Sequence, residues 1–115
     1  MNIRAPLRLE AVVVSPGDRE DTIVEAEVID LSAGGAGMLC TQYLGRSRRI
    51  TLGLSLDDGS LLALPATVAS RDRASDRRWR YGLRFVDLDD EQRAALTRQV
   101  MRALAAAFEQ SQTQA

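Results

Sequence analysis

The chain has 115 residues, of which 45% are hydrophobic and 27% charged, and its formal net charge is −1 at pH 7. This length and this balance of hydrophobic and charged residues favour a single globular domain with one modest core. The net charge gives no reason to expect broad electrostatic binding to DNA or RNA. The chain has no histidine and one cysteine. That composition excludes an internal disulfide, a cysteine-based zinc cluster and the Ser-His-Asp or Cys-His arrangements of nucleophilic enzymes.

We expect neither a signal peptide nor a membrane span. The N-terminus carries no long apolar stretch of the kind found in signal peptides, and no segment approaches the length of a membrane span. We therefore expect a cytoplasmic protein without membrane insertion. The cysteine, Cys40, lies in an apolar run, which indicates a buried and unreactive thiol.

Alternating segments predict β-strands in the first half of the chain. Residues 7–14 and 22–30 each alternate between an apolar and a polar face, as half-buried strands do. The Ser-Pro-Gly-Asp sequence at 15–18 has the composition of a turn between them. A turn rich in small residues over 30–37 then leads to a third strand at 37–43.

A predicted hairpin follows. Residues 49–57 give the clearest alternation in the chain, and Asp58-Gly59 is typical of a tight hairpin turn. The returning strand is expected at 61–70. Pro65 within it has no backbone donor, so it should lie at a strand edge or a bulge.

A charged segment precedes the last predicted strand. Residues 71–78, Arg-Asp-Arg-Ala-Ser-Asp-Arg-Arg, are predicted to form a loop. The strand follows at 79–86. One of its faces carries large residues that we assign to the core rather than to an exposed stacking surface: Trp79, Tyr81, Leu83 and Phe85.

A helix is predicted over about 90–109. Asp89 has the character of an N-cap, and Gln92 stands three residues later, as in a capping box. Apolar residues then recur at helical spacing, which predicts that the helix covers one open end or face of the sheet. They are Leu96, Val100, Leu104 and Phe108, with Met101 and Ala107 beside them. The polar tail at 110–115 is expected to fray.

Together these elements predict an all-β fold with a C-terminal helix. Six short strands with short connections favour an antiparallel sheet, and closure into a barrel removes its exposed edges. We therefore predict a single domain over residues 1–115. It consists of a six-stranded antiparallel β-barrel at about 7–88 and the helix at about 90–109.

Two arginines stand at the start of the first strand. Arg4 and Arg8 are four residues apart, and Pro6 between them disfavours a helix. A planar guanidinium matches phosphate oxygens bidentately, and it matches O6 and N7 of guanine in the same way. Taken alone, the spacing is weak evidence, and a pair of solvated charges is the simpler interpretation.

A polar corner follows the second strand. It contains Asp30, Ser32 and Gly35. A carboxylate there can accept the N1–H and N2–H₂ donors of guanine, and a glycine lets the backbone approach a ligand. Asp and Ser also commonly cap their own turns, and that alternative stays open.

The order and spacing of these motifs resemble the PilZ family. An arginine pair of the form RxxxR comes first, and a DxSxxG turn follows it at 30–35. The runs Val-Ile-Asp-Leu-Ser at 28–32 and Tyr-Gly-Leu-Arg-Phe-Val-Asp-Leu at 81–88 are similar to PilZ sequences as well. The resemblance covers nearly the whole chain.

The resemblance implies a six-stranded PilZ barrel that binds the bacterial second messenger cyclic di-GMP. Arg4 and Arg8 would bind phosphate and guanine, while Asp30, Ser32 and Gly35 would line the guanine site. Binding would order the arginine segment against the barrel. The domain would then signal to a protein partner in processes such as motility and biofilm formation, without catalysis, cofactor, metal or nucleic acid.

Other functions are weighed against this one. The main alternative is a nucleotide-independent PilZ-type interaction module, as in pilus or motility machinery, which would bind a partner through the helix face or the loop at 71–78. An enzymatic function is disfavoured because the carboxylates fall on solvent-exposed strand faces and in turns. Further arginines could add positive charge to the site, although solvated charge is their simpler interpretation: Arg46, Arg48, Arg49 and Arg71.

Overall fold

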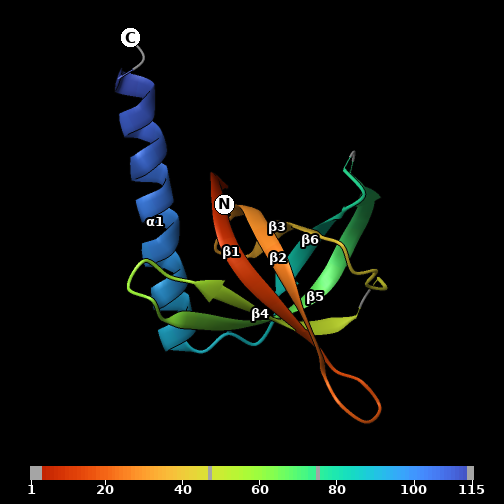
Figure 1. The fold of residues 1–115 in the computed structure, drawn as a ribbon. Coiled ribbons are helices and arrows are strands. Elements are labelled where there is room, and N and C mark those ends of the chain that lie inside the picture. The colour runs from red at the N-terminus through yellow and green to blue at the C-terminus, as the bar shows by residue number, and fades with distance from the viewer. Residues whose placement is uncertain (1–3, 47, 75, 114–115) are drawn as a thin grey trace.

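The computed structural model describes residues 4–46, 48–74 and 76–113, in which six strands precede one helix (Figure 1). The strands are β1 (Ala5–Ser15), β2 (Thr22–Leu31), β3 (Gly35–Cys40), β4 (Arg49–Ser55), β5 (Leu61–Arg73) and β6 (Trp79–Phe85), and the helix is α1 (Asp90–Thr113). Neighbouring strands are antiparallel, and the order β1-β2-β3-β6-β5-β4 closes on itself. The predicted six-stranded antiparallel barrel with a C-terminal helix is confirmed.

The apolar faces of the strands meet inside the barrel. Every strand contributes to this core, with residues such as Val13, Val28, Met38, Leu52, Leu64 and Tyr81. The Tyr81 hydroxyl accepts a hydrogen bond from the Leu44 N–H at 2.7 Å and donates to the Gln42 carbonyl oxygen at 2.6 Å. These bonds hold the chain after β3 as a loop, so β3 ends at Cys40 and not at 43. Cys40 is buried as predicted, and burial raises the pKa of its thiol.

The prediction for Pro65 is wrong. Pro65 pairs with Thr51 in a strand that has neighbours on both sides, and the register shift of β5 lies between Val68 and Ser70. The Val86 N–H donates to the Pro65 carbonyl oxygen at 2.9 Å. In an antiparallel pair the N–H and C=O of one residue point to the same neighbour. The N–H that proline lacks would therefore point to the chain just after β6 ends. Few hydrogen bonds between β5 and β6 are lost there.

The segment 71–78 is also not wholly a loop. β5 continues to Arg73, and Arg71 and Arg73 pair with Tyr81 and Trp79 of β6. A charged sequence can continue a strand because long side chains reach solvent while the backbone completes the ladder. The core prediction for this face of β6 is confirmed for Tyr81, Leu83 and Phe85, which are buried, whereas Trp79 is only half-buried.

The predicted capping box is present at the start of α1. The Gln92 N–H donates to Oδ1 of Asp89 at 2.7 Å, and Oε1 of Gln92 accepts from the Asp89 N–H at 2.8 Å. The helix packs against β1 and β5 and buries Leu96 and Val100 there. In the part of the chain that the structure describes, no helix is long and apolar enough to cross a membrane.

The C-terminal half of α1 departs from the prediction. The helix runs on to Thr113, four residues beyond 109, and residues 114–115 of the tail lie outside the described ranges. Met101 and Phe108 are 60% and 65% exposed. The apolar stripe therefore packs against the barrel as far as Leu104 and not at Phe108, and Figure 1 shows the last turns of the helix standing clear of the strands.

Candidate ligand-binding site

The pairing of β1 with β2 brings the arginine segment to the polar corner. Pro6 lies opposite Asp30, and the register shifts between Pro6 and Leu9, where β1 has one more residue than β2. Such a bulge redirects the side chains on either side of it. Nη1 of Arg4 lies 2.6 Å from Oδ1 of Asp30. Two of the five predicted site residues are thus in direct contact, although 26 positions separate them in sequence.

Asp30 is held from a second direction. The Gly37 N–H donates to Oδ1 of Asp30 at 2.9 Å, and the Asp30 side chain is only 18% exposed. A Cβ on Gly37 would lie 2.6 Å from Oδ2 of Asp30, so the carboxylate needs a residue without a side chain at this position. The sequence indicates Gly37 only as one of several turn glycines, and its contact with Asp30 was not predicted.

Ser32 shapes the turn after β2. It is buried, and its Oγ accepts from the Gly34 and Gly35 N–H groups at 3.3 and 3.1 Å. The hydroxyl also donates to the Gly35 carbonyl oxygen at 3.2 Å. The turn-capping alternative therefore describes the hydrogen bonds of Ser32 in this structure.

Gly35 lets β3 approach β6 closely. A Cβ on Gly35 would collide with the Leu83 carbonyl oxygen. The Phe85 N–H also donates to the Gly34 carbonyl oxygen at 2.9 Å beside this crossing. Gly35 is thus required by strand packing, and it fixes where the Asp30 corner lies relative to β6.

Arg8 binds a different carboxylate, which sequence reasoning missed. Its Nη1 lies 2.7 Å from Oε1 of Glu27. The same oxygen lies 3.4 Å from Nη1 of Arg78. Arg78 in turn binds Asp76 through Nη2 at 2.6 Å and Nε at 2.8 Å, and these carboxylates, Asp76 first, raise the pKa of Arg78. The only feature of the sequence that points to Glu27 as a partner of Arg8 is its place on the polar face of β2, three residues before Asp30.

A groove runs beside this arginine segment. Its volume is about 590 Å³, which is within the size range of small-molecule sites. The lining comes from the barrel and from the small residues of α1: Pro6, Leu7, Arg8, Ile29, Ala103, Ala106, Ala107 and Gln110. A second cavity, of about 460 Å³, has Glu10, Glu25 and Glu27 with Arg78 in its lining. Its three carboxylates make it the poorer site for an anion.

Three of the four further arginines considered above, Arg48, Arg49 and Arg71, have local partners elsewhere. Arg48 donates to Oγ of Ser15 at 2.6 Å, and Arg49 pairs with Asp87 at 2.9 Å. Arg71 stacks on aromatic rings. Among the residues that the structure describes, no group of three or more acidic, cysteine or histidine side chains is placed to hold a metal ion.

The comparisons with known proteins define the family. A family profile for the PilZ domain matches residues 2–102, so this chain belongs to the PilZ domain family. A search of curated proteins found no match.

Solved structures share the fold. The PilZ domain of YcgR from Escherichia coli, solved with c-di-GMP, gives a TM-score of 0.77 at 16% identity, over 96% of this chain and 95% of that one. The crystal structure of E. coli YcgR in complex with c-di-GMP gives 0.78 at 19% identity, over 100% and 49%. The K. pneumonia MrkH–c-di-GMP complex gives 0.76 at 11% identity, over 95% and 54%. This chain therefore spans about half the length of the latter two chains.

Proposed function

We propose that this chain is a receptor for cyclic di-GMP that binds the dinucleotide with the Arg4–Arg8 segment and the Asp30 corner, and relays the signal as an adaptor. The contact that carries the proposal is Arg4 on Asp30 at 2.6 Å, because it joins one residue from each of the two segments to which the proposal assigns ligand binding. Support also comes from YcgR and MrkH, relatives in fold whose structures contain c-di-GMP. The proposal assigns no catalytic step to the chain.

The chemistry of the site suits this ligand. Guanidinium groups bind phosphate oxygens and the O6 and N7 edge of guanine, while a carboxylate accepts the guanine N1–H and N2–H₂ donors. The side chains of Arg4 and Arg8 are 59% and 72% exposed. Exposed ion pairs contribute only about 0–1 kcal/mol each, so both arginines can exchange their carboxylates for ligand phosphates at little cost.

Isothermal titration with cyclic di-GMP tests the proposal. Arg8→Ala should lower the affinity at least about tenfold, because a good bidentate contact is worth roughly 1–3 kcal/mol. Arg93→Ala, an exposed arginine of α1, is the matched control and should bind like the parent chain. Circular dichroism checks that both variants are folded. The absence of heat from folded parent protein, or tight binding by the Arg8 variant, contradicts the receptor role.

One observation favours the alternative of a nucleotide-independent interaction module. Both arginines of the segment are already neutralised by carboxylates of β2, Arg4 by Asp30 and Arg8 by Glu27. In such a module these pairs would be structural, and the chain would bind its partner equally well with and without the dinucleotide. The same titration separates the two functions, because only the receptor gives a saturable heat.

A further inference from the structure

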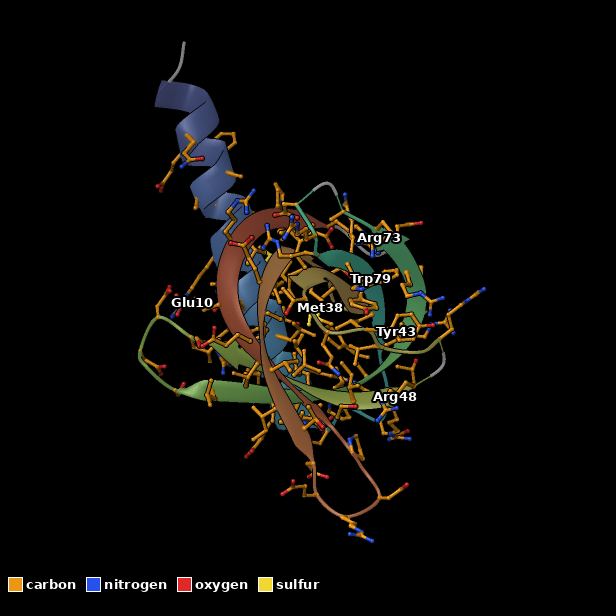
Figure 2. All side chains as sticks on the ribbon, turned by 45° about the vertical axis from the view of Figure 1, so that its right-hand side comes forward. Glu10, Met38, Tyr43, Arg48, Arg73 and Trp79 are labelled. Atoms are coloured by element: carbon orange, nitrogen blue, oxygen red, sulfur yellow. The ribbon has the colours of Figure 1, made fainter. Side chains whose placement is uncertain are left out.

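An aromatic and arginine cluster lies at the opposite end of β6 from the Gly35 crossing. Tyr43, Arg71, Arg73 and Trp79 form this Tyr43 cluster, and Figure 2 shows Arg73, Trp79 and Tyr43 following one another along one side of the barrel. The rings of Tyr43 and Trp79 meet edge to face, with centroids 5.3 Å apart. The guanidinium carbon of Arg71 is 4.5 Å from the Tyr43 ring centroid, and that of Arg73 is 5.0 Å from the Trp79 ring.

The cluster is supported from two sides. The loop that carries Tyr43 is tied to the core by the bond from the Leu44 N–H to the Tyr81 hydroxyl. On the other side, the β5–β6 ladder sets Arg73 opposite Trp79. Because these supports are a buried side chain and a pair of hydrogen-bonded strands, the backbone under the Tyr43 cluster needs little further ordering when a partner binds.

The composition of the cluster is that of a binding surface. Tyrosine, tryptophan and arginine are the residue types most enriched among those that dominate interface energies. Tyr43 is 55% exposed. None of the ion pairs among the described residues involves Arg71 or Arg73. Their charges are therefore available to an outside anion, while the rings hold the guanidinium planes in place.

We propose that the Tyr43 cluster is a docking surface for an acidic segment of a partner protein. Arg71 and Arg73 would bind its carboxylates, and the exposed part of the Tyr43 ring would contact a neighbouring apolar side chain of the segment. This surface is separate from the Asp30 corner and does not depend on nucleotide binding there.

A nucleic-acid strand is the weaker fit. Proteins that bind single strands present a continuous basic groove along the backbone. Here Asp72 lies on the opposite face of β5 from the two arginines, and Asp76 lies in the connection to Trp79, so the basic charge of the cluster does not continue past it. The net charge of the chain is also −1. A short acidic peptide segment can avoid Asp76, whereas a long polyanion passes over it.

The experiment uses Trp79 as its reporter, because it is the only tryptophan in the chain. The full chain is titrated with a random copolymer of glutamate and leucine while the Trp79 emission is followed, and calorimetry gives a second readout. We expect a saturable change that weakens as salt is added. Oligothymidylate, titrated in parallel, should bind more weakly.

Two double variants carry the same loss of charge. R71Q/R73Q removes both guanidinium groups of the cluster, and R93Q/R98Q removes two exposed ones from α1. The first should weaken copolymer binding about tenfold or more, the second by less than about twofold. Y43S, at an exposed loop position, should also weaken binding, and it serves as the test if R71Q/R73Q does not fold.

Three results would overturn the proposal. The first is the absence of a saturable response to the copolymer. The second is equal weakening by the two double variants, which would mean that only the overall charge is sensed. The third is tighter binding of oligothymidylate than of the copolymer, which would assign the surface to nucleic acid.

Discussion

The guanidinium groups have different partners in the two arginine-bearing surfaces of this barrel, the Arg4–Arg8 segment and the Tyr43 cluster. In the Arg4–Arg8 segment the arginines lie on carboxylates, at 2.6 Å from Asp30 and 2.7 Å from Glu27. In the Tyr43 cluster they lie on aromatic rings. An arginine on a carboxylate must share its charge or exchange its partner to bind an outside anion, whereas an arginine on an aromatic ring has no carboxylate competing for its charge. The first arrangement suits a selective ligand site, and the second suits a contact surface.

The largest expected effect comes from a substitution at Gly35, which supports the first surface, the Arg4–Arg8 segment with Asp30. Gly35→Ala places a methyl group against the Leu83 carbonyl oxygen, so the backbone of β3 or β6 must move. We expect a loss of about 3 kcal/mol in the free energy of unfolding, at the upper end of overpacking effects. Gly45→Ala, where no atom lies within 4 Å of the added Cβ, should stay within about 0.5 kcal/mol of the parent. Urea unfolding measures both, and equal losses would contradict the role given to Gly35.

A smaller effect is expected from a substitution at Tyr81, which supports the second surface, the Tyr43 cluster. Tyr81→Phe removes the hydroxyl that binds Leu44 and Gln42, and leaves a buried N–H without that partner. The expected loss is about 1–3 kcal/mol in the free energy of unfolding, together with a shift of the Trp79 emission as the loop relaxes. Tyr43→Phe is the matched control and should change stability by less than about 0.5 kcal/mol. A Trp79 spectrum unchanged in the Tyr81 variant would show that the loop is held by other contacts.

The smallest effect should be a gain in affinity. Glu27→Gln removes the charge that holds Arg8, and if the receptor proposal is right, cyclic di-GMP should bind about two- to fivefold more tightly, the equivalent of one exposed ion pair. Glu25→Gln, on the same strand, controls for the general loss of negative charge. Calorimetry on both variants makes the measurement. An affinity in the Glu27 variant no higher than in its control would mean that the Arg8 pair does not compete with the ligand.

The fold was predictable because its signals are local. Strict alternation over 49–57 and the Asp89–Gln92 capping box each specify an element without knowledge of its neighbours. Pro65 and the charged segment 71–78 were misjudged because their structure depends on which strand lies beside them. The exposure of Phe108 has the same origin, since helical spacing shows which side of a helix is apolar but not how far the barrel beneath it extends.

The site was predictable only in part, for a related reason. The contact of Arg4 with Asp30 follows from two motifs and a hairpin, so the sequence indicates it. Gly37 comes to lie opposite Asp30 because a bulge in β2 shifts the register with β3 between Val28 and Asp30. Glu27 meets Arg8 beside the separate register shift of β1 between Pro6 and Leu9. Nothing in the local composition marks either shift. The place of Ser32 at the ligand stays a prediction, and its burial and its hydrogen bonds to the turn are features that the sequence motif alone does not show.

Closure of the barrel limits how any protein can recognise this chain. Each of the six strands has a neighbour on both sides, and among the described residues strand ends such as residues 5–10 of β1 and 70–73 of β5 extend past one of their two neighbours. Recognition by strand addition, which reads mainly the partner's main chain, is therefore confined to such short strand ends. Over most of the barrel, selectivity has to come from side chains, loops and the protruding turns of α1.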